Sequence, residues 1–451
     1  MATRKTPFVI DMPDPAEAVS LVRAREAAWI DDVLFFGASA LLMGAALAFG
    51  ATGAYAQFVE QTASLALLGL WVTRQQAQGC IEMAGNPLYL PALAFALLIV
   101  GQFVTGRTEY RYATLSGILF LVPCGAAVLI AGELFTRRRL LRHFCFLLSV
   151  FGFAVALFAL VQDFSGSDRI YWLVKVRALS ASPYGPYANH NHYAGLMEML
   201  VPLAAASAFL ERGAKRGLLL FFSAIMAVSI VCSRSRGGIL ALSVGVIFVS
   251  GILFRMSRNR RTLFIALALG ALVAVLVIFL GNDKVVARLT ETQDSYRAAI
   301  YADSLRMWLH RPFLGFGWGT FPTVYPEYRS FYTNLFVNHA HNDYLELLVE
   351  TGVVGFAITL WFLFAAFRAG LRKVFDRDDH EGGILAIGLL SGIVSLLAHS
   401  FLDFNLHIAA NAALFFVLCS AVATPYRHHV RQLEFASWEP EEEPLIAETE
   451  A

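Results

Sequence analysis

The chain has 451 residues, of which 57% are hydrophobic and only 15% are charged. Soluble domains carry about 25% charged residues, and a chain of this length has too little interior to hide so much apolar surface. Composition therefore excludes a soluble enzyme, a disordered protein and a disulfide scaffold. The 35 Lys and Arg nearly balance the 34 Asp and Glu, so no nucleic-acid partner is expected. A helical membrane protein with many spans remains.

Apolar runs recur along the chain, and about 20 apolar residues suffice to cross a bilayer. Twelve runs are long enough or nearly so: 33–50, 56–73, 88–105, 114–135, 144–163, 193–210, 217–232, 237–254, 262–281, 345–367, 384–401 and 408–424. The predicted fold class is therefore all-α, a polytopic integral membrane protein with about twelve transmembrane helices. The transmembrane domain is expected over 33–424, between polar segments at 1–32 and 425–451.

Clusters of basic residues predict the orientation, because short loops rich in Lys and Arg stay in the cytoplasm. Four clusters occur, at 137–142, 212–216, 255–261 and 368–377, and each follows an even-numbered run. Both termini are thus expected in the cytoplasm. The opposite face then holds a connection at 164–191 and a larger loop at about 282–344. A connection as long as the second is usually functional.

The short segment Ser233-Arg-Ser-Arg-Gly-Gly238 joins the seventh and eighth runs on that opposite face. Two arginines here break the positive-inside trend. They could snorkel to the membrane interface. Alternatively, Arg234 and Arg236 could bind an anion, since a guanidinium grips phosphate with two hydrogen bonds and keeps its charge when desolvated.

The segment Pro183-Tyr-Gly-Pro-Tyr-Ala-Asn-His-Asn-His-Tyr-Ala-Gly-Leu-Met-Glu198 enters the sixth run from the same face. His190 and His192 do not share a helix face, which disfavours a metal pair. Capping, hydrogen bonding or substrate contact by Asn189 and His192 is favoured instead. Glu198 lies inside a span, where a carboxylate is costly, so it is either paired or functional.

The large loop ends in Asn338-His-Ala-His-Asn-Asp343, directly before the tenth run. A histidine is the natural proton shuttle near neutral pH, which makes His339 and His341 candidate bases. Earlier in the loop, Gly315-Phe-Gly-Trp-Gly319 follows no strand of a βαβ unit, so it predicts a flexible aromatic turn and no dinucleotide site.

Several of these segments resemble the bacterial O-antigen ligase and O-antigen polymerase superfamily, membrane glycosyltransferases that use polyprenyl-pyrophosphate-linked sugars. The ligase signature is matched by His341-Asn342, nine residues, and Gly352-Val-Val-Gly355. The segments around 185–195 and 233–238, Arg297 and the glycines after Pro312 look familiar as well. The similar segments span about 180–365, which would be the ligase-like core.

The resemblance implies specific roles. His341 would be the general base that deprotonates the acceptor hydroxyl, and Arg236 and Arg297 would grip the pyrophosphate of the donor. Arg234 or Arg288 could substitute for these arginines. The remaining candidates for substrate contact are Asn189, His192, His339, Asn342 and Glu198. No metal, nucleotide or other cofactor is required, and the reaction would take place on the periplasmic face of the inner membrane.

The acceptor stays open at this point. Lipid A–core would make the protein a ligase, a lipid-linked chain would make it a polymerase, and a protein hydroxyl would make it an oligosaccharyltransferase. The His-Asn-x9-Gly spacing favours the ligase type. A transporter with Glu198, Glu346 and Glu350 as proton-coupling groups is the rival class, disfavoured because no internal repeat is visible. A non-catalytic assembly partner is a third alternative.

Overall fold

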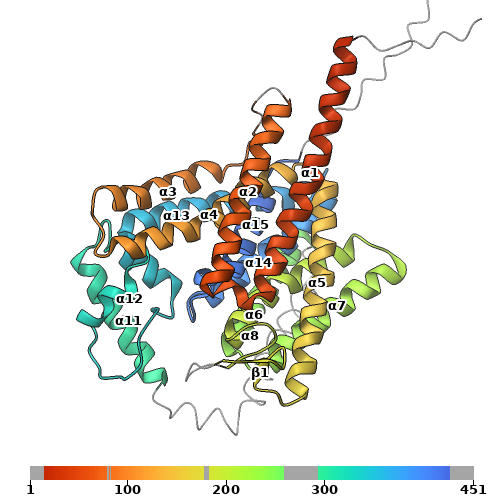
Figure 1. Cartoon of the computed structure of the whole chain (residues 1–451). Coiled ribbons are helices and arrows are strands. Elements are labelled where there is room, and N and C mark those ends of the chain that lie inside the picture. The colour runs from red at the N-terminus through yellow and green to blue at the C-terminus, as the bar shows by residue number, and fades with distance from the viewer. Residues whose placement is uncertain (1–14, 79–80, 82, 177–181, 258–292, 427–451) are drawn as a thin grey trace, which may run out of the picture.

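The structure is a computed structural model that describes residues 15–78, 81, 83–176, 182–257 and 293–426. Helices dominate these residues, and the only sheet among them is the hairpin of β1 (Arg169–Ile170) and β2 (Val174–Lys175). The all-α prediction is therefore confirmed (Figure 1).

A helix occupies each expected apolar run within this described part. These helices are α1 (Pro15–Leu47), α2 (Ala54–Gln78), α3 (Tyr89–Val104), α4 (Arg111–Leu134), α5 (Arg138–Phe164), α6 (His190–Phe209), α7 (Gly213–Cys232), α8 (Arg236–Ser257), α13 (Asp343–Phe375), α14 (His380–His399) and α15 (Ala409–Ala423). The ninth run, 262–281, and Arg288 lie outside the described residues.

Seven helices of the described chain are long and apolar enough to cross a membrane, namely α1, α4, α5, α7, α8, α13 and α14. Two shorter apolar helices, α3 and α15, accompany them. The chain is thus a polytopic integral membrane protein, while the number of twelve spans stays a prediction.

Helix α14 lies near the middle of the bundle and is the most enclosed of the seven (Figure 1). Its glycines let it approach α6 closely. A Cβ at Gly388 would lie 2.5 Å from the Cβ of Ala206, and one at Gly392 would lie 2.8 Å from the carbonyl oxygen of Met199. Small residues at such positions are the usual means of packing helices in a membrane. These contacts hold α6 and α14 side by side.

Helix α13 is broken at Gly352, whose φ of 62° lies in the left-handed region that favours glycine. The aromatic turn before α12 (Phe321–Val324) fills the break. The amides of Phe316 and Gly317 donate to the carbonyl oxygens of Val349 and Glu350 at 2.9 and 3.0 Å, and the amide of Val353 donates to Pro312 at 2.8 Å. The expected flexible turn is thus tied to a transmembrane helix by its backbone.

The described part of the large loop carries its own small core. It contains α11 (Gln293–His310), α12 and the 3-10 turn η2 (Tyr325–Glu327). Buried Met307, Phe316, Phe321 and Tyr325 pack together there. The segment from 293 to 342 is therefore a folded cap over the bundle.

Candidate active site

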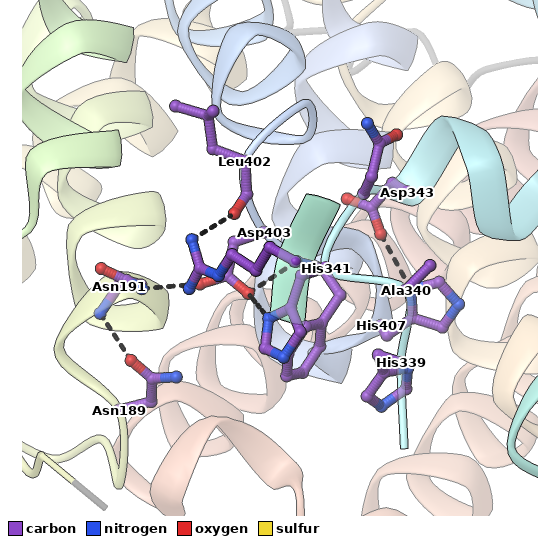
Figure 2. Close-up of polar contacts among 12 residues, drawn as sticks. Asn189, Asn191, His339, Ala340, His341, Asp343, Leu402, Asp403 and His407 are labelled. Atoms are coloured by element: carbon purple, nitrogen blue, oxygen red, sulfur yellow. Dashed lines mark hydrogen bonds and ion pairs between the residues drawn. The ribbon is translucent and has the colours of Figure 1, made fainter. Parts of the chain in front are cut away.

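The site centres on a contact between His341 and Asp403. Nδ1 of His341 lies 3.3 Å from Oδ1 of Asp403, which is 1% exposed (Figure 2). His341 has a φ of 52°, and the following Asn342 caps α13 by accepting from the amides of Tyr344 and Leu345. The left-handed residue turns the chain so that His341 lies at the mouth of the bundle, two residues before the helix begins.

Charge and hydrogen bonding fix the tautomer of His341. Burial alone would raise the pKa of Asp403, but the hydrogen bond from His341 and the electrostatic interaction with the surrounding histidines hold it well below its ordinary value. An ionised carboxylate only accepts, so Nδ1 of His341 carries the hydrogen. Nε2 makes no hydrogen bond to any described residue, and the side chain is one-third exposed. The ring can therefore take a proton at Nε2.

A chain of hydrogen bonds connects Asp403 to the arginine turn. Asn191 on α6 donates to Oδ2 of Asp403 at 2.7 Å, as Figure 2 shows. Ser235 in turn donates its hydroxyl hydrogen to the side-chain oxygen of Asn191, also at 2.7 Å. Three distant segments thus meet: the turn before α8, the start of α6 and the connection between α14 and α15.

The tandem arginines of the turn differ in their surroundings. Arg234 has a left-handed φ of 61°, and its side chain is 79% exposed, 3.9 Å from Asp163. Arg236 is the first residue of α8 and is half-buried. No carboxylate of the described chain lies within 4.0 Å of the Arg236 side chain. Arg236 is thus the better placed of the two to bind a foreign anion.

Arg297 reaches the same region from α11. Its guanidinium donates to the carbonyl oxygen of Leu402 at 3.4 Å, next to Asp403 (Figure 2). One turn further on, the hydroxyl of Tyr301 donates to the carbonyl oxygens of His341 and Phe401 at 2.9 and 3.2 Å. Arg297 also has no carboxylate within 4.0 Å among the described residues. The cap therefore places a second guanidinium without a described carboxylate partner close to Asp403.

His339 belongs to a separate cluster. Its Nδ1 lies 2.9 Å from Glu346, and His407 lies between two carboxylates, 2.8 Å from Asp343 and 3.3 Å from Glu346. Burial disfavours the charged ring, but Glu346 and Asp343 raise the pKa of His407 to about 10. One ligand atom from each of His339, Glu346 and His407 could share a metal ion, as these atoms lie within 4.8 Å of one another. A protonated His407 bridging both carboxylates accounts for the same geometry without an ion.

Three other candidates have contacts of their own. Fully buried Glu198 faces Nδ1 of His399 at 3.1 Å, so it has the pairing that a carboxylate inside a span requires. Asn189 caps α6 by accepting from the amide of Asn191 at 2.8 Å. His192 is 7% exposed and packs edge-on against Phe404, with 4.8 Å between ring centroids.

Sequence reasoning missed four polar residues of this region: Asn191, His399, Asp403 and His407. Three of these lie at intervals of four in the segment His399-Ser-Phe-Leu-Asp-Phe-Asn-Leu-His407, which connects the last two expected runs. Ionisable residues spaced four apart at the ends of two expected spans were the sequence signal that could have indicated these site residues.

The fold and site thus define an integral membrane protein with a polar centre at one end of its bundle. Residues 221–360 match the family described as O-antigen ligase. The chain therefore contains a domain of the O-antigen ligase and polymerase superfamily, and the resemblance is confirmed. This match supports, in general terms, a function in the transfer of lipid-linked glycans. The match covers Arg234, Arg236, Arg297 and His341, whereas Asn191 and Asp403 lie outside it. No curated protein matches the chain.

Proposed function

We propose that this protein transfers a glycan from a polyprenyl-pyrophosphate carrier to an acceptor hydroxyl, on the periplasmic face of the bacterial inner membrane. The observation that carries the proposal is the His341–Asp403 pair beside two arginines that have no carboxylate partner among the described residues. A base next to unneutralised cations suits a reaction in which a hydroxyl attacks and a pyrophosphate leaves.

The reaction needs one bond formed and one bond broken. The acceptor oxygen attacks the anomeric carbon of the donor sugar, and the bond from that carbon to the phosphate oxygen breaks. The electron pair leaves with the polyprenyl pyrophosphate, and the hydroxyl proton passes to Nε2 of His341. Asp403 stabilises the resulting imidazolium through the 3.3 Å contact at Nδ1.

Arg236 and Arg297 supply the charge that the leaving group requires. Negative charge grows on the pyrophosphate as the sugar bond breaks, and cationic donors aimed at it stabilise the transition state. A pyrophosphate needs little acid assistance, so this chemistry proceeds without a metal or a nucleotide. The Ser235–Asn191–Asp403 hydrogen bonds support the relative placement of the arginine turn and the base.

A ligase type of activity is favoured over polymerisation by the His341-Asn342-x9-Gly352 spacing. The carriers and acceptors of such a reaction are membrane lipids or molecules presented at the membrane. The connection at 164–191 and the loop at 282–344 would lie in the periplasm, opposite to the basic clusters.

The direct test is an assay of the purified protein in nanodiscs with a short-chain polyprenyl-pyrophosphate glycan as donor. Wild-type protein should release polyprenyl pyrophosphate and glycosylate an acceptor, detected by mass spectrometry. His341→Ala should lower kcat by about 10²–10⁴-fold, the range that a general base contributes. His310→Ala is the matched control, because His310 lies on the same cap but bonds to Tyr328. Full activity of His341→Ala would overturn the mechanism.

A further inference from the structure

Two histidines and a carboxylate meet at the boundary between the cap and the bundle. His339 precedes α13, Glu346 lies in the first turn of that helix, and His407 ends the 3-10 turn η3 (Asn405–His407). One possible ligand atom from each residue lies within 4.8 Å of the other two. Segments that are distant in the sequence thus present a set of metal-ligating groups to one another.

Both histidines approach the same oxygen atom of Glu346. Nδ1 of His339 lies 2.9 Å from Oε1, and Nε2 of His407 lies 3.3 Å from it. Ligand atoms that bind one Zn²⁺ ion tetrahedrally at about 2.0–2.1 Å lie about 3.3–3.4 Å from each other. The two nitrogen–oxygen distances are therefore close to those around a shared zinc ion. His339, whose side chain is 27% exposed, is the ring that has to turn to bring the two nitrogens equally close.

The contacts behind these ligands orient them. Nδ1 of His407 lies 2.8 Å from a carboxylate oxygen of Asp343, which leaves Nε2 directed at Glu346 (Figure 2). A histidine that ligates a metal usually donates its other ring hydrogen to a carboxylate in this way. Oε2 of Glu346 accepts from the amide of Ala340 at 2.9 Å, so Oε1 faces the two histidines. Asp343 and Ala340 thus hold the ligand atoms in place from the outer side.

The cluster borders a cavity of about 570 Å³, and all three residues line it. An ion therefore has an entry path and room for a water molecule as its fourth ligand. Two other polar atoms of the wall, Nε2 of His192 and Oε2 of Glu350, have no hydrogen bond within the described part of the chain. These residues are 7% and 1% exposed, and buried polar groups without a partner are costly. Water molecules held by an ion would supply such partners.

The ligand set selects zinc among the common divalent ions. Two imidazoles and one carboxylate with an open fourth position are a recurrent zinc combination, whereas Mg²⁺ and Ca²⁺ prefer oxygen ligands. Without an ion, a hydrogen on Nε2 of His407 bridges to Glu346. Zinc takes the place of this hydrogen, which leaves as a proton to water, because a ligating imidazole must be neutral.

We propose that His339, Glu346 and His407 bind a zinc ion, with water as the fourth ligand, and that the ion cross-links the end of the cap, the start of α13 and the connection between α14 and α15. This inference goes beyond the proposed glycan transfer, whose chemistry uses no metal. An ion bound only by the folded chain stabilises the fold, so the site can be tested without any measurement of transfer.

The test uses the full-length protein in detergent, without an affinity tag and stripped of metal with EDTA. Co²⁺ is the first probe, because four-coordinate Co²⁺ absorbs visible light far more strongly than the hydrated ion. Wild type should show this absorption at one Co²⁺ per chain, and Zn²⁺ should abolish it by displacement, whereas Mg²⁺ should not. Zn²⁺ should also raise Tm by about 2 °C or more.

Variants separate a zinc site from an ion-pair cluster. His407→Ala and His339→Gln should each weaken Zn²⁺ binding by more than about 100-fold, and Asp343→Asn by about 10–100-fold with the Co²⁺ absorption retained. His339→Gln guards against a failure of His407→Ala to fold, because it leaves the ion pairs of His407 intact. His310→Ala is the matched control, since this cap histidine bonds to Tyr328 and should leave binding unchanged.

Three results would each overturn the zinc site. Wild type that binds neither Co²⁺ nor Zn²⁺ would show that the ion pairs of His407 hold these segments by themselves. Co²⁺ that binds without the strong absorption would show a different coordination. Zn²⁺ that binds to His339→Gln with wild-type affinity would place the ion elsewhere. None of these results bears on glycan transfer, which the donor assay decides separately.

Discussion

Asp403 pairs with His341 across 62 positions of sequence, at a distance of 3.3 Å between Oδ1 and Nδ1. The contact brings the connection between α14 and α15 to the start of α13. Because Asp403 is buried and also accepts from Asn191, its orientation is set from two sides. It acts through His341, so it is a positioning residue whose effect can be separated from that of the base.

Asp403→Asn keeps the shape of this contact but removes the negative charge. We expect kcat to fall by about 10²-fold or more, because the imidazolium formed on His341 loses its stabilising carboxylate. Asp376→Asn, in the exposed turn after α13, is the control. A kcat of Asp403→Asn equal to that of wild type would contradict this role.

Gly352 should be the most sensitive glycine of α13. Its φ of 62° disfavours any side chain, and a Cβ there would lie 2.3 Å from the backbone of Phe313. Gly352→Ala should therefore lower the free energy of unfolding by about 1–3 kcal/mol. The helical control Gly251→Ala should instead be neutral or stabilising, because alanine is the better helix former. Thermal unfolding in one detergent compares them, and equal midpoints for both variants would refute the argument.

The helices could be predicted because apolar runs of membrane-spanning length are local features. Asn189 and Asn342 also begin α6 and α13 close to the expected starts of the sixth and tenth runs. The site could be predicted only in part. His341, Arg236 and Arg297 lie in motifs with recognisable local patterns. The partner of His341 is brought to it by helix packing, which no local pattern shows.

Asp403 shows why the partner of His341 could not be predicted from the sequence. It lies in a short connection with no motif of its own, and its proximity to His341 depends on how α13 and α14 pack. The glycines at 315–319 were recognised as a turn, yet their backbone partner, the break at Gly352, was not foreseen. A broken helix needs donors and acceptors from elsewhere in the chain, and sequence spacing does not show which segment supplies them.

The ion-pair cluster around His407 predicts a specific pH dependence of stability. Glu346 and Asp343 outweigh burial and raise the pKa of His407 to about 10 in the folded state, from an ordinary value of 6.5. Its contribution to stability is complete below about pH 6.5, declines as the pH rises, and is lost as the pH passes through about 10. The difference in Tm between wild type and His407→Gln should therefore shrink steadily from pH 6.5 to pH 10. His310→Gln, at an exposed histidine, should track wild type throughout, and a constant difference for His407→Gln would exclude the charged cluster.

The tandem arginines allow the anion site to be tested within one turn. Arg236 is half-buried at the start of α8 without a carboxylate within 4.0 Å in the described chain, whereas Arg234 is 79% exposed and faces Asp163. Arg236→Lys keeps the charge but loses the planar fork that grips phosphate, so kcat/KM for the donor should fall by about 10–100-fold. Arg234→Lys should change it by less than about threefold, because an exposed ion pair contributes little. Steady-state kinetics with the donor varied would measure both, and a larger loss in Arg234→Lys would reverse the assignment. Arg297→Lys should also lower it, since the Arg297 guanidinium donates to the carbonyl oxygen of Leu402, next to Asp403, and has no carboxylate within 4.0 Å among the described residues.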